Sequence, residues 1–168
     1  MSVPLVPLND GRAIPQIGLG VYKIGDDEAA RTVATALEAG YRHIDTATLY
    51  GNERGVGEGI RASGLPREQV FVTTKVWNDD HGFDETLEAF DRSLELLGTD
   101  YVDLYLVHWP IPSRDRYVDT YRALERLRQA ALAGDNLFDV LMDAVRCCSL
   151  GEITHTLFEV GGRYRRNV

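Results

Sequence analysis

Four residues have side chains that together could reduce a carbonyl group: Asp45, Tyr50, Lys75 and His108. A tyrosine hydroxyl titrates near pH 10, and a neighbouring ammonium group favours the phenolate and lowers that pKa. A carboxylate paired with the lysine keeps the lysine charged and oriented. Such a tyrosine can act as general acid towards a carbonyl oxygen, while a neutral histidine hydrogen-bonds the same oxygen. No side chain supplies a hydride, so this chemistry requires a cofactor.

Three of these residues lie at the ends of predicted strands. Asp45 ends a strand over 42–45, Lys75 ends one over 70–75, and His108 ends one over 101–108, while Tyr50 follows the first of these by five residues. In barrels of βα units, reactive side chains sit at the carboxyl ends of the strands and in the loops that follow. We therefore expect the four side chains to meet at one rim, although they could also be unrelated residues of that rim.

A repeated strand–helix pattern would position these side chains. Strands are predicted to begin at residues 17, 42, 70 and 101, and helices with apolar positions at helical spacing follow them over 26–39, 53–62, 83–97 and 117–127. A Pro-interrupted hairpin over 3–8 and 13–17 precedes the first unit. Units in series imply parallel strands with right-handed crossovers, in either a barrel or a doubly wound sheet.

Phosphate-binding motifs separate these two architectures. A doubly wound dinucleotide fold would place G-x-G-x-x-G after the first strand, but Gly18 and Gly20 have no third glycine in register. Gly55, Gly57 and Gly59 lie within a helical pattern. We therefore predict the α/β barrel. A complete (β/α)8 barrel needs about 250 residues, so we expect a partial barrel of about four βα units, with an N-terminal hairpin and a helical tail.

Composition limits the partners. The chain has 168 residues and a formal net charge of −8, which argues against a nucleic-acid or anionic-membrane ligand. No apolar run approaches the roughly 18 residues of a membrane span, and residues 1–10 have no signal-peptide pattern. Cys147 and Cys148 are adjacent, so they are not expected to form a disulfide, and no metal site has the usual spacing. We expect a cytoplasmic protein.

Residues 1 to about 128 resemble the N-terminal half of an aldo-keto reductase. The stretches that carry the resemblance are 17–20, 41–47 with 50–53, 73–77 and 103–110. The resemblance implies a catalytic tetrad of Asp45, Tyr50, Lys75 and His108, with Tyr50 as proton donor. It also implies NADPH, rather than NADH, as cofactor and a small-molecule carbonyl as substrate. Cofactor contacts would come from Gly20, Val21, Tyr22 and Asp45, and the substrate mouth would be lined by Trp77, His108 and Trp109.

The second half of that family's pattern is not recognisable in this sequence. It should supply a Ser–Asn pair and a Gln that hold the carboxamide, an aromatic side chain that stacks on the nicotinamide, and a basic loop for the 2′-phosphate. Two functions therefore stay open, an NADPH-dependent carbonyl reductase of reduced activity and a catalytically inactive fragment. The half barrel would have two open sheet edges, and a homodimer could close them.

The tail, residues 129–168, is similar to the C-terminus of cobalamin-dependent acyl-CoA mutases, particularly the fused isobutyryl-CoA mutase kind. The stretches 136–138, 148–154 and 158–167 carry this second resemblance. In those enzymes the segment is scaffold, so no cobalamin is expected here. The sequence thus predicts a reductase-like domain over 1–128, joined near residues 128–131 to a helical tail of foreign origin.

Overall fold

The N-terminal hairpin forms as predicted. A computed structural model describes residues 3–133 of the chain. In it β1 (Leu5–Pro7) pairs antiparallel with β2 (Ala13–Pro15). The connecting turn places Gly11 at φ +84°, a backbone conformation that glycine adopts at little cost. The hairpin forms a two-stranded sheet of its own.

Four parallel strands form the main sheet, in the order of the chain. They are β3 (Leu19–Gly20), β4 (His43–Asp45), β5 (Phe71–Val76) and β6 (Leu104–Val107). Helices α1 (Asp26–Glu38), α2 (Glu53–Ala62) and α3 (Phe83–Leu97) connect them, and α4 (Tyr117–Ala133) follows β6. Short 3-10 helices η1 (Thr48–Tyr50), η2 (Arg67–Gln69), η3 (Asn78–Asp80) and η4 (Pro112–Arg114) lie in the loops. The α/β class and the series of βα units are therefore as predicted.

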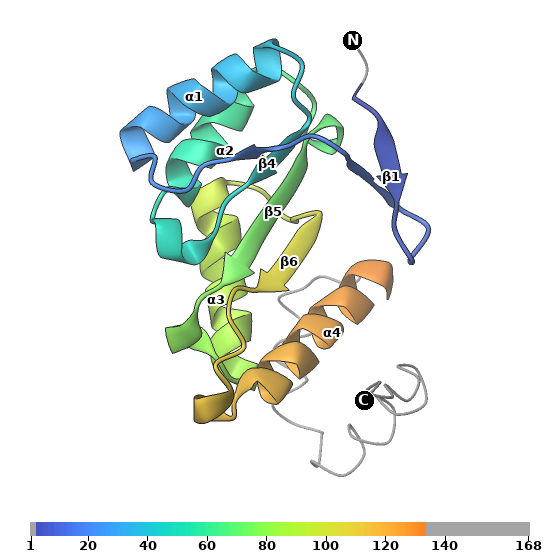
Figure 1. Cartoon of the computed structure of the whole chain (residues 1–168), viewed down its shortest axis with the longest axis vertical. Helices are drawn as coiled ribbons and strands as arrows, with labels where there is room; N and C mark the ends of the chain where they lie inside the picture. Colours follow the sequence, from blue (N-terminus) through green and yellow to red (C-terminus); the bar gives the residue numbers. More distant parts are fainter. Residues whose placement is uncertain (1–2, 134–168) are drawn as a thin grey trace, which may run out of the picture. The chain divides into compact units, whose positions relative to one another are not determined.

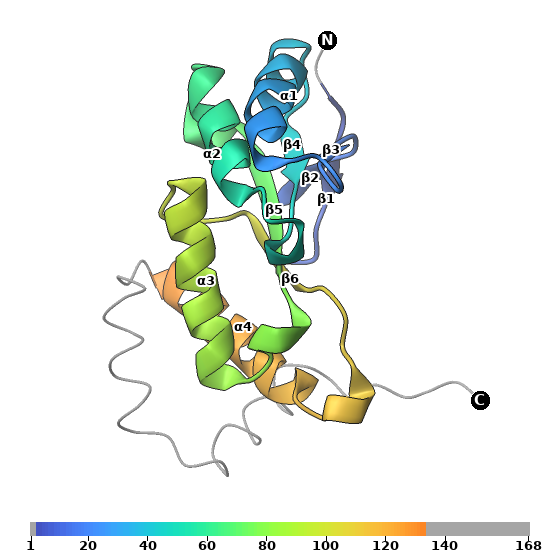
Figure 2. The ribbon, with the colours of Figure 1, turned by 90° about the vertical axis from the view of Figure 1, so that its left-hand side faces the viewer.

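Helices α1, α2 and α3 follow one another along one side of the sheet (Figures 1 and 2). The core lies between them and the outward-facing side chains of the strands, because alternate strand residues point to opposite faces. Its centre is a cluster of fully or nearly fully buried aliphatic side chains, among them Val33, Leu37, Ile44, Val56, Val72 and Leu97. The opposite residues of β4 and β5, including Asp45 and Lys75, therefore face the inside of the partial barrel.

Three glycines of α2 allow the helices to pack closely. A Cβ atom on Gly55 would collide with the carbonyl group of Asp26 in α1, and one on Gly57 with the carbonyl group of Leu97 in α3. A Cβ atom on Gly59 would likewise crowd the backbone of Ala30. These glycines serve helix packing, which confirms their placement in a helix rather than in a phosphate-binding loop.

The fourth strand is shorter than predicted. We expected it over 101–108, but β6 covers only Leu104–Val107. Before it, the carbonyl of Tyr101 accepts a hydrogen bond from the guanidinium of Arg67 instead of pairing with a strand. At the other end, the amide of His108 still donates to the carbonyl of Val76, but the chain then turns away through Pro110.

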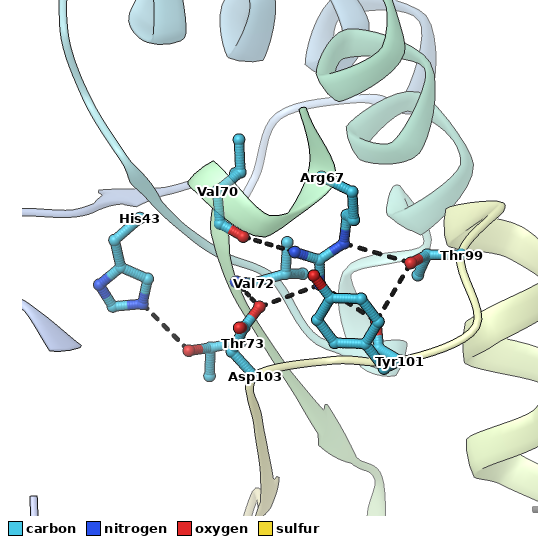
Figure 3. A network of polar contacts seen from close by, with 8 residues as sticks. All are labelled: His43, Arg67, Val70, Val72, Thr73, Thr99, Tyr101 and Asp103. Atoms are coloured by element: carbon cyan, nitrogen blue, oxygen red, sulfur yellow. Dashed lines mark hydrogen bonds and ion pairs between the residues drawn. The ribbon is translucent and has the colours of Figure 1, made fainter. Parts of the chain in front are cut away.

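Arg67 is the centre of a polar network at the amino ends of β5 and β6 (Figure 3). Its guanidinium donates to the carbonyls of Val70 and Tyr101, to Thr99 Oγ1, and to Asp103 Oδ2 at 2.9 Å. The guanidinium also lies 4.1 Å from the centre of the Tyr101 ring. Asp103 Oδ2 in turn accepts the amide of Val72 at 2.9 Å. One ion pair thus joins η2, β5 and the segment that leads into β6.

By its contacts, the chain divides into two units between residues 126 and 127. Helix α4 crosses this division and runs to residue 133, past the predicted boundary at 128. Nearly all of the predicted tail, with Cys147, Cys148 and His155, lies outside the described residues, so its likeness to the mutases stays a prediction. Among residues 3–133, no helix is long and apolar enough to cross a membrane.

Candidate active site

Asp45 and Lys75 form an ion pair at the carboxyl ends of adjacent strands. Lys75 Nζ lies 2.6 Å from Asp45 Oδ1 and donates a second hydrogen bond, of 2.8 Å, to the carbonyl of Thr46. The lysine side chain is only 13% exposed and that of the aspartate 33% exposed. The pair register explains this meeting, because Asp45 pairs with Thr73 and Lys75 lies two residues further along the same face of β5. The lysine is therefore held as a fixed cation at the rim.

Tyr50 lies beside this cation. It ends the 3-10 helix η1, which begins three residues after β4. The ammonium of Lys75 is 5.2 Å from the centre of the Tyr50 ring. The same ring contacts Tyr22 on one side, at 5.0 Å between ring centres, and His108 on another, at 5.6 Å and nearly perpendicular. The four residues predicted to do chemistry are thus gathered in one place.

His108 is the uncharged member of the cluster. Partial burial lowers the pKa of its imidazole below the ordinary value, and the nearby ammonium of Lys75 lowers the pKa further, against an opposing effect of Asp45. The neutral imidazole is therefore the main form at neutral pH. Its ring packs against Trp77 as well as Tyr50, with 5.1 Å between the Trp77 and His108 ring centres. A neutral imidazole can donate one hydrogen bond to a substrate oxygen without adding a charge.

Buried polar residues that sequence reasoning did not single out hold the rim together. Thr46 and Asn52 are both fully buried. Thr46 Oγ1 donates to Asn52 Oδ1, and the Asn52 amide donates to two backbone carbonyls of the loop after β3. Thr48 Oγ1 donates to the carbonyl of Lys75. All three lie in the segment between β4 and α2 that contains Tyr50. Their polar side chains in a segment between buried elements were the sequence signal that could have identified them.

A buried carboxylate, that of Glu53, lies behind the rim. It is 2% exposed and accepts hydrogen bonds from Thr74 Oγ1 at 2.6 Å and Ser93 Oγ at 3.3 Å. Burial raises the pKa of this carboxyl, and the two hydroxyl donors oppose that effect. Thr74 belongs to the face of β5 opposite Lys75, so Glu53 joins α2, β5 and α3 beneath the site rather than within it.

The predicted cofactor and mouth residues differ in accessibility. Tyr22 and Trp109 are each 60% exposed, so neither is a core side chain. Trp77 is half-buried against His108. Val21 has no exposed surface, so only its backbone could approach a ligand, whereas nothing lies within 4 Å of a Cβ placed on Gly20. The contacts of these residues with cofactor or substrate stay predictions.

The other two histidines among the described residues, His43 and His81, lie in packed environments. His43, in β4, has its Nε2 3.0 Å from Thr73 Oγ1, and its ring packs edge-on against Phe71. His81 lies in the loop between η3 and α3 but is 1% exposed, so it is an interior residue. No group of three or more potential metal ligands occurs among residues 3–133.

The described residues fit one end of a nicotinamide cofactor. Tyr50, His108 and Lys75 present a phenol, a neutral imidazole and an ammonium around one point, which is the donor set that a carbonyl under reduction needs. The open space over Gly20 and the exposed ring of Tyr22 leave room for a flat ring beside Tyr50. Within the described part of the chain, this fit covers the reacting end of the cofactor and not its phosphates.

The chain is similar to known proteins over most of its length. The model of the "Aldo/keto reductase family" matches residues 16–134. Glyoxal reductase of Bacillus subtilis (strain 168) is 54% identical over 123 residues, which are 73% of this chain and 44% of that protein. A crystal structure of an aldo/keto reductase from Brucella melitensis has 59% identity and a TM-score of 0.76, covering 78% of this chain and 50% of that one.

A Bombyx mori aldo-keto reductase solved in complex with NADP has 42% identity and a TM-score of 0.71, covering 79% of this chain and 48% of that one. NADP(H) is thus the cofactor found with similar structures. The chain spans about half the length of the curated relatives that it matches.

Proposed function

Because this chain belongs to the aldo/keto reductase family, we propose that its rim catalyses the NADPH-dependent reduction of an aldehyde or ketone. The observation that carries the proposal is the convergence of four side chains from three βα units, with Lys75 bonded to Asp45 and lying 5.2 Å from the Tyr50 ring. The relatives support the reaction class, and the NADP complex of a similar structure supports the cofactor.

In this reaction, residues of the chain would donate the proton and stabilise the group that it leaves. NADPH supplies the hydride to the carbonyl carbon when it is bound. Tyr50 then gives its hydroxyl proton to the carbonyl oxygen, so that a C–H and an O–H bond replace the C=O π bond. The Lys75 ammonium, held by Asp45, stabilises the phenolate left on Tyr50. Neutral His108 hydrogen-bonds the substrate oxygen and orients it towards Tyr50.

Gly20, Tyr22 and the backbone of Val21 would lie along the nicotinamide, and Trp77 and Trp109 beside the substrate. The exposed indole of Trp109 and the half-buried one of Trp77 support a mouth at this rim. A small carbonyl compound suits the site, since one relative of this chain is a glyoxal reductase. The reaction needs a pool of reduced cofactor, so the cytoplasm is the compartment that we propose.

A matched pair of tyrosine variants tests the activity. Tyr50→Phe removes the proposed proton donor, whereas Tyr121→Phe removes a hydroxyl from a side chain that is 58% exposed on α4. We expect Tyr50→Phe to lose carbonyl reduction by about 10²-fold or more and Tyr121→Phe to keep it, both measured as NADPH oxidation with a small aldehyde. Equal rates in all three proteins would reject the proposal.

An inactive fragment is the second candidate function. The observation that favours it is β6, which is the last strand of the sheet among the described residues and leaves Leu106 37% exposed on the inner face. In a complete barrel the next strand and the opposite wall would cover that face. Wild-type turnover that does not exceed that of Tyr50→Phe would identify the chain as inactive.

A homodimer would cover the same edge, and we propose it as the assembly of an active form. Rotation of a second copy by half a turn about the barrel axis would place β6 of one copy beside β3 of the other, twice, to give eight parallel strands. Sedimentation over a range of concentrations tests this assembly. A monomer at every concentration would exclude it.

The boundary near residue 128 and the foreign origin of the tail are likewise proposals. Peptide mapping of the protein from its native source would detect a peptide that spans the junction if the joined chain is a real product.

A further inference from the structure

The loop between β3 and α1 is a tight turn with a strained residue. The amide of Ile24 donates to the carbonyl of Val21 at 3.1 Å, so that residues 21–24 close a four-residue turn with Tyr22 and Lys23 at its centre. Lys23 has φ +65°, in the left-handed region that favours glycine at the third position of such a turn. The turn therefore needs support from outside its own sequence.

Asn52 gives that support. Its amide nitrogen donates to the carbonyl of Val21 at 3.0 Å and to that of Ile24 at 2.9 Å, which are the first and last residues of the turn. Its side-chain oxygen accepts the Thr46 hydroxyl at 2.7 Å. Asn52 has no exposed surface, and a buried amide with three partners is costly to remove because each partner would lose one hydrogen bond away from water.

The same turn presents Tyr22 to the proposed proton donor. The centres of the Tyr22 and Tyr50 rings are 5.0 Å apart, although Tyr22 is otherwise 60% exposed. Asn52 is two residues after Tyr50 and immediately precedes α2, so it is fixed on the Tyr50 side of this contact. The amide thus joins the segment that carries Tyr50 to the turn that carries Tyr22.

We propose that Asn52 is a positioning residue that holds the 21–24 turn in its strained form and thereby keeps the Tyr22 ring against Tyr50. The contact limits the directions in which the Tyr50 ring can turn and keeps that ring beside His108 and the Lys75 ammonium. The catalytic consequence rests on the proposed function, whereas the coupling between Asn52, the turn and Tyr50 does not.

Tyrosine-ring NMR of the full chain tests the coupling without any turnover. The Tyr50 ring signal is identified with Tyr50→Phe, and Tyr22→Leu gives the shift that follows loss of the neighbouring ring. We expect Asn52→Ala to reproduce most of that shift and Thr46→Val to give a smaller shift in the same direction. Ser93→Ala removes a buried hydroxyl that bonds Glu53, and it should leave the Tyr50 signal in place.

Lys23→Gly separates positioning from general stability. Glycine tolerates the positive φ of residue 23, so the turn should form without the support of Asn52. The double variant Lys23→Gly with Asn52→Ala should therefore bring the Tyr50 signal back towards its wild-type position. Where the single and double variants turn over a carbonyl, we expect the turnover number to fall on the order of tenfold in Asn52→Ala and to recover in the double variant.

A Tyr50 signal that stays at its wild-type position in folded Asn52→Ala would overturn the proposal, as would a displaced signal that Lys23→Gly does not restore. If Asn52→Ala does not fold, an unmoved Tyr50 signal in Thr46→Val is the contradicting result. A wild-type chain without reductase activity would contradict the proposed function alone, because the NMR comparison would still decide the coupling.

Discussion

The two ends of the parallel sheet carry ion pairs of similar geometry but different surroundings. At the amino ends of the strands, Arg67 donates to the backbone carbonyls of Val70 and Tyr101, and Asp103 accepts the backbone amide of Val72 (Figure 3). At the carboxyl ends, Lys75 and Asp45 leave Tyr50 and His108 held mainly by ring contacts. Side chains with few fixed partners are free to engage a ligand, so we infer that the first pair stabilises the fold and that the second belongs to the proposed active site.

Replacement of each cation by methionine is the most direct way to test this contrast. Lys75→Met should reduce carbonyl reduction by at least about 10²-fold, because the Tyr50 phenolate loses its cation. The loss of unfolding free energy should stay below that of Arg67→Met, since the Asp45 carboxylate is a third exposed and can regain water, and Lys75 has fewer hydrogen bonds to lose. Activity assays and denaturant melts on the same samples check both parts. A Lys75→Met protein that is fully active would contradict the catalytic role proposed for the carboxyl ends of the strands.

Arg67→Met should show the opposite behaviour. The change leaves the carboxylate of Asp103 and two backbone carbonyls without a charged donor, at a cost of about 2 kcal/mol of unfolding free energy. The side chains are about a fifth to a quarter exposed, which keeps the cost below that of a fully buried pair. Turnover per folded molecule should be unchanged. A large loss of turnover in a protein of normal stability would contradict the structural role of this end.

Replacement of Glu53 should have a smaller effect, which would appear in the pH dependence of the free energy of unfolding. The pKa of Glu53 is raised in the folded chain, so the folded state binds the proton more tightly than the unfolded state. This contribution to stability is complete below the unfolded value of 4.5 and is lost as the pH rises through the folded pKa. Glu53→Gln should remove that part of the pH dependence in melts recorded from pH 4 upward. A variant with the wild-type slope would show that folding does not raise the pKa of Glu53.

Replacement of His43 should have the smallest effect, and it should change the pH dependence of stability in the opposite direction to replacement of Glu53. Burial lowers the pKa of His43 below the usual 6.5, so its contribution to stability is present above that pH and is lost as the pH falls through the folded pKa. His43→Gln keeps a polar partner for Thr73 without a titrating group, and it should weaken the acid-side loss of stability. His108 has the same sign, so some acid-side loss should persist in the variant. The absence of any change would show that folding does not lower the pKa of His43.

The sequence predicted the series of βα units and the gathering of Asp45, Tyr50, Lys75 and His108. Both rest on local patterns: alternate burial in strands, helical spacing of apolar residues, and the rule that parallel strands end at one rim. The exclusion of a phosphate loop at Gly55, Gly57 and Gly59 also followed from a local pattern, and the contacts of these glycines in α2 explain it.

The interior polar contacts could not be predicted in the same way. The two hydrogen bonds that the Asn52 amide donates span about 30 residues, and the Arg67–Asp103 pair spans 36. Such partners become neighbours only through the packing of whole helices and strands. The shortened β6 has the same origin, because the Tyr101 carbonyl bonds to a guanidinium from η2. Likewise, the sequence around His81 contains no pattern that would predict the burial of this side chain in its loop.

The proposed reaction requires, above all, that the rim of this chain binds NADPH. A thermal melt of the purified full chain with and without saturating NADPH tests it directly, because a ligand that binds only the folded state must raise its stability. We expect one cooperative transition that moves to higher temperature with NADPH. A broad transition, or a cooperative one that NADPH leaves in place, would contradict it.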